Sequence, residues 1–238
     1  MIINKEKCIG CGDCVPYCVM GAISLSGEFA TIDLHECVEC GVCIRADVCP
    51  VDAIEQQPLE WPRSLRSFFS DPTAKHPDTG LAGRGTAEMK TNDVTGRFKS
   101  GEVGVGIELG RPGLGTWFTD VEKVAMAIAP LGLQWEPENP TTPLIVDKST
   151  GKLQDDVLNE KALSAILEFI MPSEKLEELL KALDKVAKEI DTVFSLEIIT
   201  KVEPDGSMPN IEKAMELGYE PMPNPKVNVG LGRPKFNG

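Results

Sequence analysis

Residues 7–23 read KCIGCGDCVPYCVMGAI and place four cysteines within eleven positions, at Cys8, Cys11, Cys14 and Cys18. A second stretch over residues 36–54, ECVECGVCIRADVCPVDAI, supplies Cys37, Cys40, Cys43 and Cys49. No cysteine follows Cys49. The eight sulfurs therefore lie in one short segment, and what they hold decides how that segment folds.

The cysteine spacing indicates what the sulfurs bind. It is C-x2-C-x2-C-x3-C in the first stretch and C-x2-C-x2-C-x5-C in the second. A thiolate at every third residue can reach three corners of a 4Fe-4S cluster, which leaves the fourth corner to a distant cysteine. Structural zinc usually takes two separated CxxC pairs. The spacing predicts iron-sulfur clusters, while two four-cysteine zinc sites, a disulfide framework and a cluster with a purely structural role remain open alternatives.

The two stretches are an internal repeat. An offset of 29 residues maps Cys8, Cys11 and Cys14 onto Cys37, Cys40 and Cys43, and it also maps Gly12 onto Gly41. An offset of 31 maps CVMGAI (residues 18–23) onto CPVDAI (residues 49–54). The second unit thus carries a two-residue insertion within residues 44–48. Glycine at the matched loop position allows a sharp backbone turn close to the sulfur ligands.

The segments CIGCGDCVPYC and CVECGVCIRADVCP resemble the bacterial-type ferredoxins that carry two 4Fe-4S clusters, over about the first 56 residues. The resemblance implies crossed ligation, in which the fourth cysteine of each run serves the cluster of the other run. One cluster would then take Cys8, Cys11, Cys14 and Cys49, and the other Cys37, Cys40, Cys43 and Cys18. Two departures from the family pattern, the insertion and Val19 where proline is usual, leave open whether the two clusters share the same environment and potential.

Composition and charge limit the partners. The net charge is −13 over 238 residues, which disfavours nucleic acid and anionic membranes as partners. The longest apolar run, over residues 124–133, is interrupted by Pro130 and Gly132 and is shorter than the roughly 20 residues that span a bilayer. The first residues, MIINKEKC, lack the features of a secretory signal. We expect no membrane span and a reducing, cytoplasmic location.

The cysteine-rich segment is itself acidic. Residues 1–57 hold three Lys or Arg and nine Asp or Glu. This imbalance predicts docking onto a basic surface of a redox partner, either a reductase or a flavoprotein, although acidity of this kind also serves solubility.

The chain divides into four predicted parts with an α+β fold overall. Residues 1–57 form the two-cluster domain and residues 58–102 an irregular wrapping segment rich in Pro, Gly, Asn and Asp. Residues 103–203 form a βαββαβ domain, the split βαβ sandwich, with an insertion at 139–163. Residues 204–238 form a Pro-rich tail with one short helix in NIEKAMELG. The seven basic residues of the wrapping segment suggest pairing with the two-cluster domain: Arg63, Arg66, Lys75, Arg84, Lys90, Arg97 and Lys99.

The βαββαβ pattern follows from hydrophobic periodicity. Strands are predicted in VGVGIELG, LQWEPE, SAILEFIM and VFSLEIITKVE, and helices in TWFTDVEKVAMAIAPLG and PSEKLEELLKALDKVAKEI. Ser173 is the expected N-cap of the second helix, whose apolar stripe runs from Leu176 to Ile190.

Two motifs in this region suggest ligands. GVGIELG (residues 104–110) approaches the dinucleotide fingerprint but has one residue too many before its last glycine. The loop in ELGRPGLGTWFTD, with Arg111, leads to a helix start near Thr116 or Thr119 whose free amides could bind a small anion; the alternative is a tight turn that needs glycine. His35 and His76 are expected at the surface.

Residues 84–124 resemble a stretch of iron-sulfur proteins of the 6-hydroxynicotinate-reductase type, which implies anaerobic catabolism of aromatic compounds and transfers no catalytic residue. The sequence as a whole favours an electron-transfer protein or subunit. A reductase that acts on its own substrate near Arg111 and a ligand-binding redox sensor remain the alternatives.

Overall fold

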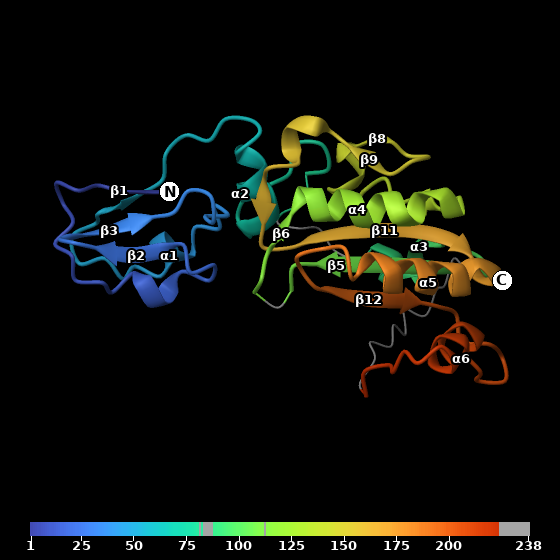
Figure 1. The fold of residues 1–238 in the computed structure, drawn as a ribbon. Helices are drawn as coiled ribbons and strands as arrows, with labels where there is room; N and C mark the ends of the chain where they lie inside the picture. Colours follow the sequence, from blue (N-terminus) through green and yellow to red (C-terminus); the bar gives the residue numbers. More distant parts are fainter. Residues whose placement is uncertain (81, 83–87, 112, 224–238) are drawn as a thin grey trace.

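Residues 1–80, 82, 88–111 and 113–223 are described in a computed structural model (Figure 1). Two separate hydrophobic clusters lie at its two ends. The smaller one is in the N-terminal domain, residues 1–57, and the larger one is in the part of the chain around a four-stranded sheet, which we call the sheet region. The parts of the predicted wrapping segment and tail at 81, 83–87 and 224–238 lie outside the described residues, as do Arg84 and Pro112.

The N-terminal domain contains little regular structure. Strand β1 (Ile2–Ile3) pairs with β4 (Ile54–Glu55), and β2 (Ile23–Ser26) forms a hairpin with β3 (Phe29–Ile32). One 3-10 turn, η1 (Val15–Tyr17), and one short helix, α1 (Val42–Arg45), lie in the cysteine-rich stretches. The buried residues of its hydrophobic cluster are Met1, Cys14, Ala22, Ile23, Ala30, Cys37 and Cys43. This core is too small to stabilise the domain without another contribution.

The internal repeat is visible in the backbone. Gly10 and Gly12 have φ angles of 67° and 82°, and the residues 29 positions later, Glu39 and Gly41, have φ angles of 54° and 69°. Gly21, with φ 65°, likewise corresponds to Asp52, with φ 50°. Both units therefore fold into the same left-handed turns, although in the second unit two of these positions carry side chains that disfavour them.

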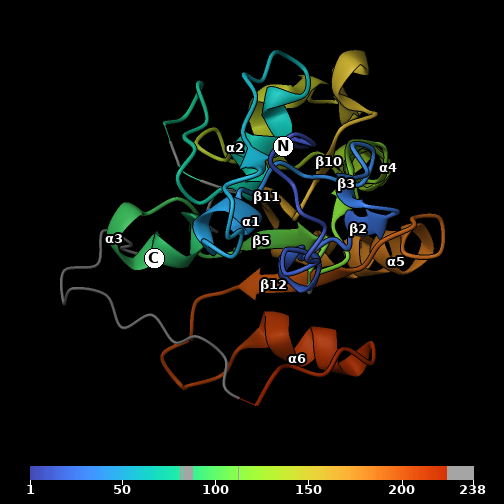
Figure 2. The same ribbon diagram turned by 90° about the vertical axis from the view of Figure 1, so that its left-hand side faces the viewer.

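The sheet region is built on four strands in the order β12-β5-β11-β7. These are β5 (Glu102–Leu109), β7 (Gln134–Trp135), β11 (Ala165–Pro172) and β12 (Phe194–Ile199), and every neighbouring pair is antiparallel. Helix α4 (Phe118–Ile128) and helix α5 (Leu176–Val186) pack on one side of the sheet, and α3 (Asn92–Thr95) lies on the other (Figure 2). The turn η2 (Glu88–Thr91) precedes α3 in the chain.

The side chains of β5 point alternately to the two sides of the sheet, which explains why both sides are covered. Val103, Val105, Ile107 and Leu109 are fully buried in the main core, together with residues of α4 and α5. Gly104 faces the other side, where an added Cβ would lie 2.8 Å from Met89 and 3.1 Å from Phe98. The glycine therefore lets Met89 and Phe98 cover that side of the sheet closely.

The chain between β7 and β11 adds small elements beside α4. Strand β8 (Ile145–Asp147) pairs with β9 (Lys152–Leu153), and β10 (Lys161–Ala162) pairs with β6 (Thr116–Trp117). The 3-10 turns η4 (Thr142–Leu144) and η5 (Asp155–Val157) lie in the same stretch. Two others, η3 (Ala129–Leu131) and η6 (Ser173–Lys175), come before β7 and after β11. Helix α6 (Pro209–Glu216) follows β12 and packs on α5.

Two local expectations were wrong. The wrapping segment predicted as irregular contains helix α2 (Ser64–Ser70), whose seven residues are too few to show a clear helical period. Ser173 does not cap a helix with its side chain: it begins the 3-10 turn η6, and α5 begins three residues later at Leu176. Among the described residues, no helix combines the length and the apolar character needed to cross a bilayer.

Candidate iron-sulfur centres

The structure gathers the eight cysteines into two sets. Cys18, Cys37, Cys40 and Cys43 line a hollow with an empty volume of about 350 Å³. Cys8, Cys11, Cys14 and Cys49 line another hollow of about 310 Å³. We call the group with Cys8 the first set and the group with Cys37 the second set. In each set, the cysteine that comes from the other stretch of sequence joins three that are close neighbours in the chain.

The two long-range cysteines have matching surroundings. The amide of Ala22 donates a hydrogen bond to Cys18 Sγ at 3.1 Å, and the amide of Ala53 donates to Cys49 Sγ at 3.2 Å. Ala22 and Ala53 correspond under the repeat offset of 31. Amide donors to sulfur stabilise the thiolate over the thiol and tune the potential of a bound cluster.

Burial disfavours thiolates while no cation is present. It raises the pKa of Cys14, Cys37 and Cys40 above the ordinary value, and it raises the pKa of Cys43 to about 11. The neighbouring thiols of the same set add to the shift at Cys43 and Cys14. Because metal binding requires thiolates, a cluster bound by these cysteines would displace these protons, and its cations would stabilise the thiolates.

The donor sets fit 4Fe-4S clusters. Each supplies four sulfurs around a hollow, which matches the ligand number and type that such a cluster needs. Within the described part of the chain, no three or more His, Cys, Asp or Glu side chains converge as the ligands of a single metal ion do. The four sulfurs of each set are therefore spread too widely to be the ligands of one zinc ion.

Glu39 fixes the loop of the second set from behind. Its carboxylate is 1% exposed and accepts hydrogen bonds from the Met1 ammonium at 2.5 Å and from Arg63 at 2.5 and 2.9 Å. Burial alone would raise the pKa of Glu39, but these two cationic partners lower it below its ordinary value. The ion pairs offset the cost of holding a non-glycine residue in a left-handed turn.

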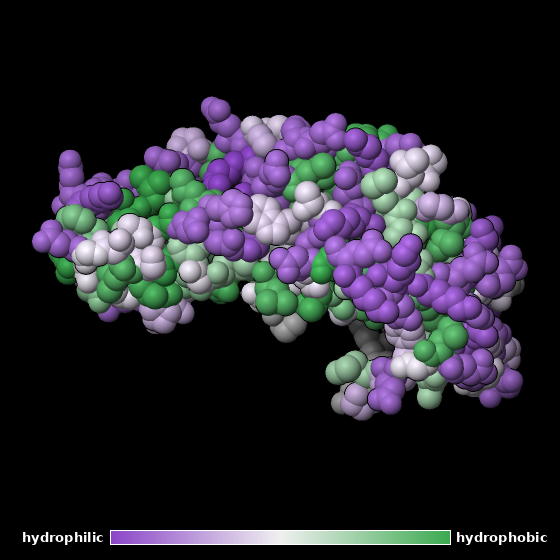
Figure 3. All heavy atoms as spheres, viewed as in Figure 1, coloured by the Kyte–Doolittle hydropathy of each residue, from purple (hydrophilic) through white to green (hydrophobic). Residues whose placement is uncertain are grey.

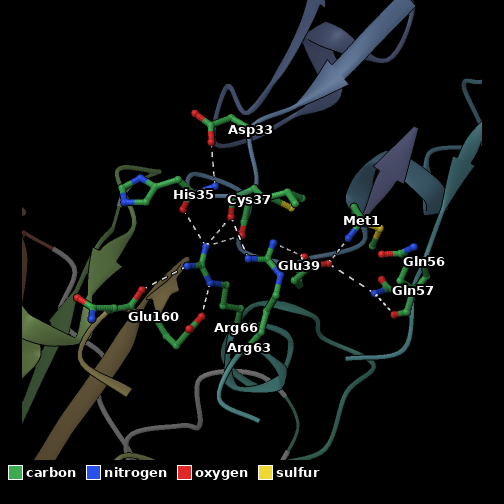
Figure 4. A network of polar contacts seen from close by, with 12 residues as sticks. Met1, Asp33, His35, Cys37, Glu39, Gln56, Gln57, Arg63, Arg66 and Glu160 are labelled. Atoms are coloured by element: carbon green, nitrogen blue, oxygen red, sulfur yellow. Dashed lines mark hydrogen bonds and ion pairs between the residues drawn. The ribbon is translucent and has the colours of Figure 1, made fainter. Parts of the chain in front are cut away.

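Helix α2 joins the two ends of the molecule. Arg66 is 4% exposed and donates to the backbone carbonyls of His35 at 2.8 Å and Cys37 at 2.9 Å. Its Nε donates to Glu160 of the sheet region at 2.5 Å (Figure 4). Arg66 therefore ties the loop of the second set to the sheet region.

Further contacts complete this junction. Lys161 of β10 pairs with Glu36 at 2.5 Å, and the His35 ring lies 4.5 Å from the Trp117 ring. Arg45 donates to the Cys40 carbonyl at 2.6 Å and to Asp71 at 2.9 Å. These contacts add polar and aromatic links between the N-terminal domain and the segments that follow it.

The expected pairing of the wrapping segment with the N-terminal domain occurs at Arg63 and Arg66. The roles of Glu39 and Glu160 were not predicted, because only the fold brings them to these arginines. The one sequence signal was the acidic residue Glu39 at the repeat position held by Gly10.

The loop that follows Arg111 lies close to the N-terminal domain at Gly115, whereas a Cβ at Gly113 would meet nothing within 4 Å. A Cβ at Gly115 would lie 2.7 Å from the Met20 side chain, and Met20 lines the hollow of the second set. The amides of Phe118 and Thr119 donate to the carbonyls of Glu160 and Leu158. These two amides are therefore already engaged and do not offer an anion site, and Arg111 instead lies 3.3 Å from Glu108.

The two histidines differ in burial. His35 is exposed as expected, but the expectation for His76 was wrong, because His76 is 1% exposed. Its ring lies against those of Phe68 and Phe69, and burial lowers its pKa. The two phenylalanines explain its position, since a neutral imidazole packs well among aromatic rings.

Comparison with known proteins bears on the N-terminal domain alone. Residues 7–53 match the 4Fe-4S dicluster domain family. A ferredoxin-like protein in the vnf region of Azotobacter chroococcum is 44% identical over 55 residues, which cover 22% of this chain and 85% of that protein. The pyruvate synthase subunit PorD of Methanothermobacter marburgensis is 40% identical over 55 residues, or 23% of this chain and 62% of PorD.

A third relative is larger. It belongs to an ion-translocating oxidoreductase complex of Methanosarcina acetivorans and is 44% identical over 53 residues, or 22% of this chain and 19% of that protein. This chain thus spans less than two thirds of the length of PorD and of this third relative, each of which is named as a subunit. No solved structure matches the chain.

The match and the two cysteine sets agree on the same residues. Through its N-terminal part the chain belongs to the family of 4Fe-4S dicluster domain proteins, and it carries a ferredoxin-type iron-sulfur electron-transfer domain for two 4Fe-4S clusters.

Proposed function

We propose that the chain is an electron-transfer protein or subunit that relays single electrons through two 4Fe-4S clusters to or from a partner oxidoreductase. The observation that carries the proposal is the pair of four-cysteine sets around two hollows within one small domain. The bound clusters supply one-electron redox chemistry. In each turnover an electron donor is oxidised by one electron and an acceptor is reduced by one, with no bond formed or broken in the chain.

The proposal includes crossed ligation. Cys8, Cys11, Cys14 and Cys49 would hold one cluster and Cys37, Cys40, Cys43 and Cys18 the other. The shared lining of each hollow supports this assignment, as do the matched amide donors to Cys18 and Cys49. Crossing also explains how a domain with a small apolar core is held together, because each cluster links the two halves of the repeat.

The division of the chain is part of the same proposal. We assign residues 1–57 to the cluster domain, 58–102 to the connecting segment, 103–203 to a split βαβ sandwich with an insertion at 139–163, and 204–238 to the tail. The strand order β12-β5-β11-β7, with α4 after β5 and α5 after β11, supports the split βαβ assignment. The role given to this sandwich is to fix the cluster domain in place on its partner.

The partner is proposed to be a reductase or flavoprotein with a basic docking surface. Residues 1–57 carry three basic and nine acidic side chains, and thiolate-ligated clusters add negative charge. Apolar side chains are also exposed on this domain, as Figure 3 shows, with Ile9 64%, Val19 47% and Leu25 49% exposed. Exposed apolar side chains on an acidic domain suit a partner protein that binds transiently. A reducing, cytoplasmic location completes the proposal, since cluster ligation needs free thiolates.

The alternatives of a reductase and of a ligand sensor both need a ligand pocket in the sheet region. The hollows of the two cysteine sets are lined by residues no later in the chain than Ile54. The two cysteine-lined hollows support electron transfer, and a small anion near Arg111 is not included in the proposed function.

The test is electron exchange between the full chain, purified without oxygen, and cytochrome c as a basic one-electron acceptor. The proposal predicts rapid reoxidation of the reduced chain at low salt and a rate that falls as ionic strength rises. A neutral viologen is the control, and its rate should change little with salt. Clusters that cannot be reduced reversibly, as expected if they only stabilise the fold, would contradict the proposal.

A further inference from the structure

Cations surround the two cysteine sets unequally. Beside the second set, Arg66 donates to the carbonyl of Cys37 and Arg45 donates to the carbonyl of Cys40. The Met1 ammonium and Arg63 meet on Glu39, the neighbour of Cys40. Among the described residues, no arginine or lysine donates to a backbone carbonyl of the four cysteines of the first set.

Arg66 differs from the other cations because it comes from outside the N-terminal domain and is also buried. Its side chain is 5% exposed and that of Glu160 is 12% exposed, so water screens this pair weakly. The guanidinium lies between the Cys37 carbonyl and the Glu160 carboxylate (Figure 4). The positive end of the pair therefore faces the second set, and the negative end faces the sheet region.

An ion pair with this orientation changes the reduction potential of a nearby redox group. Reduction adds one negative charge, and a positive charge that is closer than its counterion stabilises the reduced form and raises the reduction potential. Lys7 and Glu55, an ion pair close in sequence to the ligands of the first set, are both exposed to solvent. Water therefore screens that pair more strongly than it screens Arg66 and Glu160.

We propose that Arg66, held by Glu160, is a tuning residue that raises the potential of the cluster bound by the second set above that of the cluster bound by the first. This proposal rests on the proposed function and on crossed ligation. Electrons would enter and leave through the cluster of the first set. They would reside on the cluster of the second set, beside Arg66 and Glu160.

The test compares four variants of the Arg66–Glu160 pair, made in the full chain, by a redox titration followed by electron paramagnetic resonance. Arg66→Gln leaves Glu160 unopposed, so the potential of the second-set cluster should fall by about 59 mV, a tenfold change in its ratio of reduced to oxidised form. Glu160→Gln leaves Arg66 unopposed, so that potential should rise. The double variant should lie between the two, and Arg66→Lys should stay close to the unaltered chain.

Opposite signs separate tuning from folding. A purely structural role for this pair predicts that Arg66→Gln and Glu160→Gln act in the same direction, through loosening of the junction. Arg97→Gln is the matched control, because Arg97 likewise forms carboxylate ion pairs, with Glu136 and Glu138, but in the sheet region. It should leave both potentials unchanged. The Cys49→Ala chain, expected to keep the second-set cluster, assigns the signals.

Two results would overturn the inference about Arg66, and a third would also overturn the proposed function. Equal shifts of both clusters, or shifts of the same sign in Arg66→Gln and Glu160→Gln, would reject the tuning role while leaving electron transfer intact. An unaltered chain that binds far fewer than about eight iron atoms, the number that two 4Fe-4S clusters require, would reject the proposed function itself.

Discussion

Three of the seven buried residues in the core of the N-terminal domain are cysteines, whereas the core of the sheet region contains none. The sheet region buries long apolar side chains such as Phe118, Phe169 and Leu180 between its sheet and helices. The interior of the N-terminal domain instead contains two hollows that are lined by cysteine side chains. Metal ligation in one region therefore replaces the apolar burial that stabilises the other.

Iron removal is expected to produce the largest difference between the two regions. Anaerobic chelation should abolish hydrogen-exchange protection in residues 1–57, because the small core cannot hold the fold alone. Protection in β5 and β11 should persist. Unfolding of both regions together on chelation would show that the sheet region also depends on the clusters.

The reverse experiment acts on the apolar core. Phe169 is fully buried in β11, so Phe169→Ala should destabilise the sheet region by about 3–5 kcal/mol. The iron content of the chain should remain unchanged at low temperature. Loss of iron in this variant, measured by elemental analysis, would mean that the N-terminal domain needs the sheet region to keep its clusters.

A single cysteine substitution sharpens the comparison inside the N-terminal domain. Cys18→Ala should remove the cluster of Cys37, Cys40 and Cys43 and lower the iron content from about eight to about four atoms per chain. Cys49→Ala should remove the other cluster. The measurement is iron analysis together with the paramagnetic resonance spectrum of the remaining cluster, and loss of the first-set cluster in Cys18→Ala would refute crossed ligation.

A glycine pair tests how closely the cluster loops are packed. A Cβ at Gly10 would lie 2.3 Å from the carbonyl oxygen of Glu28, and φ there is 67°. Gly10→Ala should therefore lower the stability of the N-terminal domain by about 3 kcal/mol or more. Gly27 has φ 70° with nothing within 4 Å of an added Cβ, so Gly27→Ala should cost about 1 kcal/mol. Thermal unfolding of the holo chains measures both, and equal losses would contradict the packing argument.

The smallest expected effect concerns charge at the surface of the sheet region. Hydrogen bonds from Lys181 and Lys213 lower the pKa of Glu177 from 4.5 to about 2. Because the folded pKa lies below the unfolded one, this contact between α5 and α6 is fully present above about pH 4.5 and is lost as pH falls toward 2. The protection factors of the α6 amides, corrected for the intrinsic pH dependence of exchange, should fall over that range. Glu177→Gln should remove the pH dependence, and an unchanged profile in that variant would rule out Glu177 as its cause.

Sequence was most informative where chemistry or periodicity is local. The cysteine spacing predicted two sets of ligands, and alternation along residues 103–110 predicted β5, because both patterns repeat within a few residues. The junction could not be predicted in this way. Arg66 meets the carbonyls of His35 and Cys37 and the carboxylate of Glu160, residues that lie 29 to 94 positions away in the chain.

Burial at single positions was equally hidden from the sequence. His76 looked like a surface residue in a polar segment, yet two phenylalanines of the short helix α2 enclose it. Because the sequence did not predict helix α2, it did not predict the burial of His76 either. Glu39 was counted only as one more acid in an acidic domain, whereas its burial makes it an anchor for the Met1 ammonium and Arg63.

The most direct test of the electron relay is an anaerobic reductive titration of the full chain, with absorbance recorded after each electron equivalent. Two clusters that relay electrons should take up about two electrons per chain and return both to an added acceptor. Uptake of both electrons with full recovery would support the relay. Uptake of none, or of one electron that cannot be recovered, would contradict it.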